Sequence, residues 1–426
     1  MENLVATKSK DEILQPPARL PVIALFTANA VSSVGTVMTQ LALPWFVLQT
    51  TGSAAKTGLV SFFVIIPTIF AAFIGGTLVD RMGFRRSSIL ADWACTLTIA
   101  VIPLLYAAGM LEFWALLVLV FFTSLFDTPG VTARTALLPV LAVKANMTFE
   151  QASTGSQVIN RVSRLIGAPL AGLLIAIFGA TQVLWIDAST FAFSALLIML
   201  TVPAVRNQSK EKEEKEKTSF WEELREGITF LWHDRLMRMV IMVVMVTNML
   251  DGAVFGVVLP FYAKNFLGAA LDLGLLLAAN GGGAVIGALI FGAFSQKLPQ
   301  RYLFVYGLMF ASLEFFSLAL MPPYWVLIVC FLLVGIMVGP INPIIVAVMY
   351  ARIPEKNLGK TIGVVAGAVN VVTPVGVLIA GLLLDQVNIQ VLLAVTGILY
   401  VGTTSVLAFS RAVRQIDQKA VTVKAN

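Results

Sequence analysis

The sequence predicts an all-α polytopic membrane protein with twelve transmembrane helices in two pseudo-symmetric six-helix halves. Hydrophobic residues make up 58% of the chain and charged residues only 12%, against about 25% charged residues in ordinary soluble domains. Apolar runs of roughly 20 residues, long enough to cross a bilayer core of about 30 Å, recur along the chain. A membrane barrel would need short alternating strands instead, so the runs indicate helices.

The first apolar run begins at Leu20. It is too long for the core of a signal peptide and no small-residue cleavage site follows it, so we expect a retained transmembrane helix. The six spans of the first half are predicted at 20–49, 55–79, 87–108, 113–140, 150–178 and 181–203. Those of the second half are predicted at 236–266, 270–296, 301–321, 323–350, 357–384 and 388–410.

The polar segments divide the chain around these spans. The predicted organisation is an N-terminal tail (1–19), a first half (20–203), a linker (204–235), a second half (236–410) and a C-terminal tail (411–426). The linker begins with a mixed-charge run and continues with apolar residues at helical spacing, from Phe220 to Leu231. Two interpretations fit that second part: a helix lying in the membrane interface, or a helix packed on the bundle.

The basic residues predict the orientation of the chain. With both termini in the cytoplasm, 23 of the 29 Lys and Arg residues fall on the inner side and only two, Lys56 and Lys264, in outer loops; the other four lie within or beside predicted spans. This split follows the positive-inside rule. It accounts for the net charge of +6 without a nucleic-acid partner and suits a multi-pass protein of the inner cell membrane.

The two halves resemble each other in sequence. NAVSSVGTVMTQLALPWF (29–46) aligns with NMLDGAVFGVVLPFY (248–262), and AGLLI (171–175) with AGLLL (380–384). Six-span repeats in the same orientation imply a pseudo-two-fold axis along the membrane normal, with a substrate path at the interface of the halves.

Soluble-enzyme chemistry finds no support in the sequence. The two cysteines lie far apart within apolar runs and the single histidine, His233, lies in a polar loop. There is no metal-ligand spacing, phosphate loop or nucleophile motif. We therefore expect no enzyme activity, no cofactor and no metal.

A charged motif, GGTLVDRMGFRR at 75–86, lies between the second and third spans on the predicted cytoplasmic side. Gly76 and Gly83 permit a tight turn there. Asp80 can face the positive N-terminal end of a neighbouring helix. Carboxylates or helix C-terminal carbonyls are the expected partners of the three basic residues, Arg81, Arg85 and Arg86.

This motif resembles the corresponding loop of the major facilitator superfamily, and of its drug-export branches in particular. The resemblance implies the twelve-helix fold of that superfamily and a cytoplasmic latch. In such a latch Asp80 faces the start of the eleventh span near Lys360, and the basic residues hold the halves together when the protein opens outward. Phe84 stands where the family often has a cation, which leaves open whether Arg85 or Arg86 makes the family's pairing.

A second resemblance lies in the fifth span, RLIGAPLAGLL at 164–174. It is similar to the glycine-proline pattern of the superfamily's antiporters, of which Gly167, Pro169 and Gly172 are present. Small residues let helices approach closely and Pro169 bends the span. The resemblance implies export against protons, whereas an ordinary kinked packing helix fits the same residues.

Charged residues inside predicted spans are candidates for function, because a charge in hydrocarbon is costly. Asp127 lies near mid-depth of the fourth span, with Arg134 two helical turns further on the same face. Arg161 and Arg164 of the fifth span are predicted counter-charges for Asp127. A structural ion pair, or a contact with the motif at 75–86, is the alternative; Asp92 is assigned to that motif.

The second half contributes Asp251 and Glu314 as candidate proton or substrate residues. Asp187, near the outer end of the sixth span, is expected to face water. Asn29 and Asn248 lie in the first and seventh spans, which the family resemblance places around the central cavity.

We interpret the chain as a secondary transporter, a monomer, that exports amphipathic small molecules or drugs in exchange for protons by alternating access. The apolar character of the first, fourth, seventh and tenth spans favours hydrophobic substrates. An importer or facilitator of a small metabolite is the alternative among transporters, and a non-transporting receptor or scaffold is the alternative outside them.

Overall fold

The computed structural model describes residues 19–203, 229, 232, 234–295, 298–353, 358–410, 413 and 416. Helices make up nearly all of this part of the chain, and twelve of its helical segments are long and apolar enough to cross a membrane. The predicted number of spans is thereby confirmed. The interpretation of the linker helix at 220–231 lies outside the described residues, apart from the single position 229.

Each span of the first half is one continuous helix. These helices are α1 (Leu20–Thr51), α2 (Ala54–Met82), α3 (Phe84–Ala107), α4 (Phe113–Lys144), α5 (Phe149–Phe178) and α6 (Ala180–Thr201). Five of them contain an internal proline, which bilayer helices tolerate when neighbouring helices satisfy the freed backbone groups.

Four of the six spans of the second half are interrupted. The seventh comprises α8 (Arg235–Ala253), α9 (Leu259–Tyr262) and two π-helical segments, and the ninth comprises α11 (Gln300–Ala311) and α12 (Leu313–Leu320). The tenth comprises α13 (Tyr324–Val338) and α14 (Ile341–Arg352), and the eleventh α15 (Leu358–Asn370) and α16 (Thr373–Leu384). Only α10 (Ala270–Phe294) and α17 (Ile389–Phe409) are unbroken.

Proline and glycine account for three of the four interruptions. Pro260 follows the first π-helical segment, Gly339 and Pro340 separate α13 from α14, and Pro374 is the second residue of α16. A proline has no N–H to donate and its ring clashes with the preceding turn. The backbone therefore changes its helical geometry at these points.

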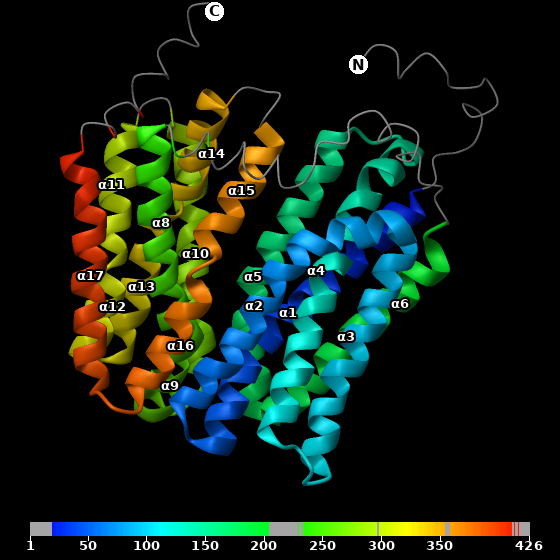
Figure 1. Cartoon of the computed structure of the whole chain (residues 1–426), viewed down its shortest axis with the longest axis horizontal. Coiled ribbons are helices and arrows are strands. Elements are labelled where there is room, and N and C mark those ends of the chain that lie inside the picture. Colours follow the sequence, from blue (N-terminus) through cyan, green and yellow to red (C-terminus); the bar gives the residue numbers. More distant parts are fainter. Residues whose placement is uncertain are drawn as a thin grey trace, which may run out of the picture.

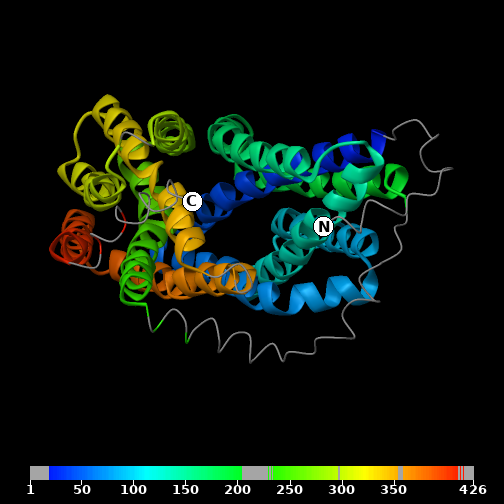
Figure 2. The same cartoon turned by 90° about the horizontal axis from the view of Figure 1, so that it is seen from above.

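The helices form two bundles, α1–α6 and α8–α17, which lie side by side (Figure 1). The bundles pack against each other through two helix pairs, α2 with α16 and α5 with α10. Seen from above, α16 lies along α2 on one side of the molecule and α10 lies beside α5 on the other (Figure 2). They approach most closely where α1 ends and α2 begins, and they diverge toward the end where α1 begins (Figure 1).

The apolar core follows this arrangement. The largest cluster of buried residues joins both halves, with Leu43 of α1 and Ala171 of α5 in the same cluster as Leu273 of α10 and Val377 of α16. The three smaller clusters each belong to a single half. Among the described residues, the halves therefore share buried apolar surface only toward one end, which we call the closed end.

The turn between α2 and α3 is shorter than expected. Helix α2 continues through Met82 and α3 begins at Phe84, so Gly83 alone forms the connection, with a φ of 87° that favours glycine. Gly76 lies inside α2, so its predicted place in the turn is wrong. The helix extends through this position because the flanking residues continue the apolar pattern of the span.

Candidate functional site: a central cavity between the halves

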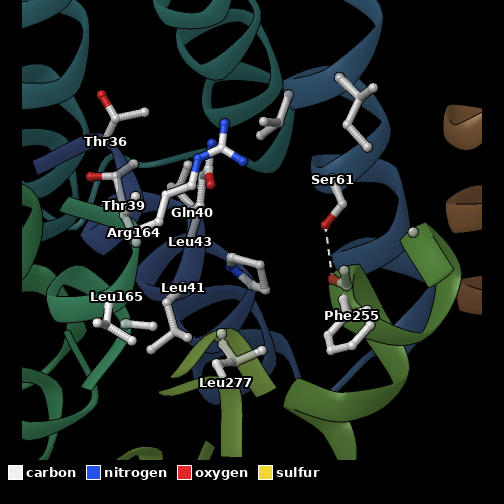
Figure 3. A pocket seen from close by; sticks show the side chains of 18 of the residues that line it. Thr36, Thr39, Gln40, Leu41, Leu43, Ser61, Arg164, Leu165, Phe255 and Leu277 are labelled. Carbon is white, nitrogen blue, oxygen red and sulfur yellow. Dashed lines mark hydrogen bonds between the residues drawn. The ribbon is translucent and has the colours of Figure 1, made fainter. Parts of the chain in front are cut away.

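A cavity of about 870 Å³ lies between the two halves. Helices α1 to α6 line one side of it, and residues of the seventh, eighth and tenth spans line the other. Figure 3 shows labelled side chains of α1 and α5 on one side, Ser61 of α2 beside Phe255 of the second half on the other, and Leu277 of the second half below them. The volume falls within the range of about 300–1,000 Å³ typical of small-molecule sites.

The two walls of the cavity differ in polarity. Among the described residues that line the cavity, the charged ones all come from the first half, and they are Asp127, Arg161, Arg164 and Asp187. The second half contributes two amides, Asn280 and Asn342, among otherwise apolar residues and glycines. The site therefore presents a polar, charged wall to an apolar one.

Asp92 of α3 and Arg134 of α4 form a buried ion pair behind the polar wall. Arg134 Nη1 lies 2.5 Å from Asp92 Oδ1, and the two side chains are 3% and 2% exposed. The hydroxyl of Ser194 in α6 donates to the other carboxylate oxygen at 2.7 Å. These contacts join three helices, so Asp92 and Arg134 hold the bundle together behind the cavity surface.

Asp127 lies close enough to this pair to interact electrostatically with both of its members. The expected pairing of Asp127 with Arg161 or Arg164 is wrong in this conformation, because neither arginine forms an ion pair with any described residue. The helical spacing of Asp127 and Arg134 placed them near each other as expected. Asp92, from a third helix, takes the direct contact with Arg134.

Asp187 borders the cavity, but its side chain has no exposed surface, so the expectation that it faces water is wrong. It is fully buried between α1 and α6, where its carboxylate accepts hydrogen bonds from the hydroxyls of Thr39 and Thr190. Gly35 of α1 faces the same carboxylate and leaves room for it. Two hydroxyl donors replace water around the carboxylate, which explains how this position can lie inside the helix bundle.

Asn29 and Asn248 lie outside the cavity lining. Asn29 of α1 donates to Asn160 of α5 at 3.0 Å, and Asn248 of α8 donates to the carbonyl of Val369 in α15 at 3.1 Å. The two bonds occupy equivalent places in the halves, since one joins the first span to the fifth and the other joins the seventh to the eleventh.

Asp251 and Glu314 form a second buried polar group, within the second half and behind the apolar wall. Glu314 of α12 is 3% exposed and accepts a hydrogen bond from Asn280 of α10. Asp251 of α8 lies beside the hydroxyl of Tyr400 in α17. Neither carboxylate lines the cavity, but Asn280 does, and it thereby connects Glu314 to the cavity surface.

The residues of the fifth-span motif pack at interfaces. Gly167 faces Val37 of α1, where an added Cβ would lie 2.8 Å from its side chain. A Cβ added to Gly172 would lie 2.7 Å from the carbonyl oxygen of Ala270 and 3.1 Å from Cα of Gly274, both in α10 of the other half. Pro169 lies on the same face, against Gly274.

The matching AGLLL segment makes an equivalent contact across the halves. A Cβ added to Gly381 of α16 would lie 2.9 Å from the carbonyl oxygen of Ala54 and 2.9 Å from Cα of Gly58, both in α2. Glycine lets two helix backbones approach this closely. The two related segments, one in each half, therefore form the two close helix crossings between the halves.

Two charged side chains cross between the halves at the closed end. Asp385, directly after α16, accepts hydrogen bonds from the backbone N–H groups of Ala54 and Ala55 and from the hydroxyl of Ser53. Lys264 of the seventh span donates to the carbonyl of Leu48 near the end of α1. The acid lies at a helix N-terminus and the base at a helix C-terminus, as helix dipoles favour.

The sequence predicts neither contact. Lys264 is one of the two basic residues in predicted outer loops, and Asp385 follows the predicted eleventh span at 357–384. The adjacent signal was the AGLLL segment at 380–384, whose small residues mark a close helix crossing directly before Asp385.

The charged motif at 75–86 is only partly described. Arg85 donates to the carbonyl of Met199 in the last turn of α6 at 2.6 Å, which confirms a helix C-terminal carbonyl as its partner. Arg81 and Arg86 are exposed. The side chains of Asp80 and Lys360 lie outside the described residues, so the predicted latch contact stays a prediction.

The sequence and the fold of this chain are similar to those of known membrane transporters. The family model MFS_3, described as "transmembrane secretion effector", matches residues 16–425. The Multidrug efflux pump Tap of Mycobacterium tuberculosis (strain ATCC 25618 / H37Rv) is 28% identical over 402 residues, which cover 94% of this chain and 95% of that protein. Macrolide efflux protein A of Streptococcus pyogenes is 21% identical over 411 residues, which cover 94% and 98%.

Solved structures share the fold at lower identity. The crystal structure of the nucleoside transporter NupG superposes with a TM-score of 0.71 at 13% identity, and the match covers 93% of this chain and 98% of that one. A bacterial homologue of the iron transporter ferroportin superposes with a TM-score of 0.66 at 15% identity, over 93% and 100% of the two chains.

Proposed function

Because this chain belongs to the transmembrane secretion effector family of the major facilitator superfamily of transporters, we propose that it exports amphipathic small molecules in exchange for protons. The observation that carries the proposal is the cavity of about 870 Å³ between the halves, which is closed at one end by contacts from both. The drug-efflux activities named for its relatives support the direction of transport.

Alternating access fits the way in which the closed end is held. Two glycine crossings, the contacts of Asp385 and Lys264, and a hydrogen bond from the hydroxyl of Ser61 to the carbonyl of Gly256 join the halves there. Such contacts can separate by rocking of one half against the other. We place the protein in the inner cell membrane with both termini in the cytoplasm. On that placement the described conformation is closed to the outside.

Asp127 is our candidate for the proton-binding residue. It lines the cavity, and it lies near the Asp92–Arg134 pair without a hydrogen bond to any described residue. Protonation of Asp127 would remove its attraction to Arg134 and its repulsion of Asp92. Such a change alters the charge of the cavity wall, which is what coupling of proton and substrate requires.

The motif at 75–86 is proposed to act in the opposite conformation. Arg81 and Arg86 are exposed, which leaves them available to contact the second half when the cytoplasmic ends of the helices approach. Arg85 already holds the end of α6. We assign it the separate role of fixing α3 against α6.

The proposal is tested by transport in inside-out vesicles with an imposed proton gradient, acid inside. The assay follows the uptake of a panel of amphipathic fluorophores and macrolides. We expect uptake that depends on the gradient and is lost in Asp127→Asn, whereas the exposed carboxylate variant Glu112→Gln keeps it. Uptake of no compound would contradict export, and undiminished uptake by Asp127→Asn would contradict the assigned proton site.

A further inference from the structure

Two arginines of α5 face the cavity at its middle. Arg161 and Arg164 both line it, and their spacing of three residues places them on the same face of the helix. Arg164 has 15 residues of α5 before it and 14 after it, so it lies near the midpoint of a helix that crosses the membrane. At this depth a guanidinium is costly unless it faces water or an opposite charge.

Neither arginine has a partner among the described residues. Arg134, the other arginine of this region, is neutralised by Asp92, whereas Arg161 and Arg164 form no ion pair and no side-chain hydrogen bond. Both are exposed to the cavity. Figure 3 shows Arg164 extending into it, in the view that also labels Gln40 and Thr39.

Neither carboxylate of the same wall forms an ion pair with these arginines. Both oxygens of Asp187 accept hydrogen bonds from threonine hydroxyls, and its side chain is fully buried. Asp127 interacts with the Asp92–Arg134 pair. The charged hydrogen-bond donors that a molecule in the cavity would meet, among the described residues, are therefore the two guanidiniums.

The opposite wall suits an apolar body. Phe255, Pro260 and Leu277 of the second half line it together with glycines and small aliphatic residues. A molecule with an anionic group at one end and an apolar body at the other would match both walls. Arginine binds planar oxyanions through two parallel N–H donors, which makes carboxylate, sulfonate and phosphate groups its favoured partners.

We infer that the cavity selects amphipathic anions, and that Arg161 and Arg164 bind the anionic group of the transported molecule. This inference rests on the proposed function and narrows it from amphipathic molecules in general to one charge class. The dissolved substrate supplies the missing counter-charge of the two arginines. The lipophilic cations that many efflux assays use would meet two like charges in the same place.

Equilibrium binding to the purified protein tests the inference without requiring transport. Two probes are compared, a dansyl fluorophore that carries a sulfonate and the same fluorophore with a quaternary ammonium on the same linker. The protein is placed in phosphatidylcholine nanodiscs and fluorescence anisotropy is recorded. We expect the sulfonate probe to bind at least about tenfold more tightly, since a charge-assisted hydrogen bond contributes about this factor.

The variants locate the effect. Arg161→Gln/Arg164→Gln is expected to lose about tenfold or more in affinity for the sulfonate probe and to lose the preference between the probes. Arg161→Lys/Arg164→Lys, which keeps both charges, is expected to retain the preference. Arg238→Gln removes an arginine that lies outside the cavity lining and is expected to bind both probes as the unaltered protein does.

Three binding results would each overturn the inference: equal or tighter binding of the ammonium probe, unchanged sulfonate affinity in the double Gln variant, and displacement of the probe by phosphatidylglycerol added to the nanodisc. The last would identify a lipid headgroup as the bound anion. Gradient-driven uptake of neutral or cationic compounds without an anion preference would refute this inference and keep the proposed function. Anion binding without transport of any compound would keep this inference and refute the proposed function.

Discussion

Asp385, at the end of α16, accepts a hydrogen bond from the backbone N–H of Ala54 at 3.0 Å and thereby caps a helix of the opposite half. The N–H of Ala55 donates to the same carboxylate at 3.1 Å. The first N–H groups of a helix have no partner within it, so the second half of the protein completes the N-terminus of α2. The closed end is held in part by backbone groups that become unpaired when it opens.

Removal of this cap is expected to favour the outward-open state. Asp385→Ala removes three partly exposed hydrogen bonds, and we expect the equilibrium to shift by about 1–2 kcal/mol, or roughly 5- to 30-fold. The reporter is a cysteine in the cavity, Leu277→Cys, labelled by an impermeant maleimide applied at the face where Asp385 lies. Glu112→Ala, which removes an exposed carboxylate near another helix N-terminus, should leave the labelling rate unchanged.

A larger side chain at a glycine crossing is expected to keep the two halves apart at the closed end. Gly172→Val places side-chain atoms against the backbone of Ala270 and Gly274, so the halves can close at this end only if α5 and α10 move apart. We expect a larger distance between spin labels on the two helices, by double electron–electron resonance. Gly402→Val is the matched control, because a Cβ there meets no atom within 4 Å. An unchanged distance in Gly172→Val would contradict the role of the crossing.

The buried ion pair predicts a large loss of stability when one partner is removed. Asp92→Asn leaves Arg134 charged and buried, which costs about 3–5 kcal/mol. We expect a lower unfolding temperature in detergent, and partial recovery when Arg134→Gln is added. Additive effects of the two substitutions would show that the side chains act independently.

A second ion pair predicts a dependence on pH. Burial acts to raise the pKa of Asp234, but hydrogen bonds from the N–H of Met237 and from Arg352 outweigh it, and the pKa is lowered. A lowered folded-state pKa stabilises the protein at any pH above the unfolded value of about 3.9, and this contribution is lost as the pH falls through the folded value. The difference in unfolding temperature between the unaltered protein and Asp234→Asn should be constant from pH 5 to 7.

The same difference should shrink as the pH falls below about 4. The measurement is a series of thermal unfolding curves for both proteins in one detergent. A difference that grows toward acid pH would contradict the sign of the lowered pKa. Because the pair is partly exposed, the effect should also decrease at high salt.

Hydrophobic length determines the spans, and it is a local property of the sequence. The twelve spans could therefore be predicted within a few residues, as at α5, where the expected 150–178 compares with Phe149–Phe178. The end of α2 lies at Met82 rather than at the predicted residue 79, because a charged motif indicates a loop. A single glycine with a positive φ was enough to form the turn there.

Partners of buried charges could not be predicted, because they depend on which helices become neighbours. The sequence places Asp127 and Arg134 on one face of α4, and the structure keeps them near each other. The sequence does not indicate that Asp92 of α3 forms the ion pair with Arg134, or that the hydroxyls of two threonines donate to Asp187. Arg161 and Arg164 were recognised as charges within the membrane, but not as residues without a partner.

The unequal continuity of the helices has a mechanical consequence. Every span of the first half is one α-helix, although five of them contain a proline, whereas four spans of the second half change helical geometry within the membrane. Two of these changes, at Gly256 and Gly339, lie in the apolar wall of the cavity, and the described charged groups of the cavity lie in the opposite wall. Repacking at these points would let the apolar wall adjust to cargoes of different size during a transport cycle, while the charged wall keeps the buried pair of Asp92 and Arg134 behind it.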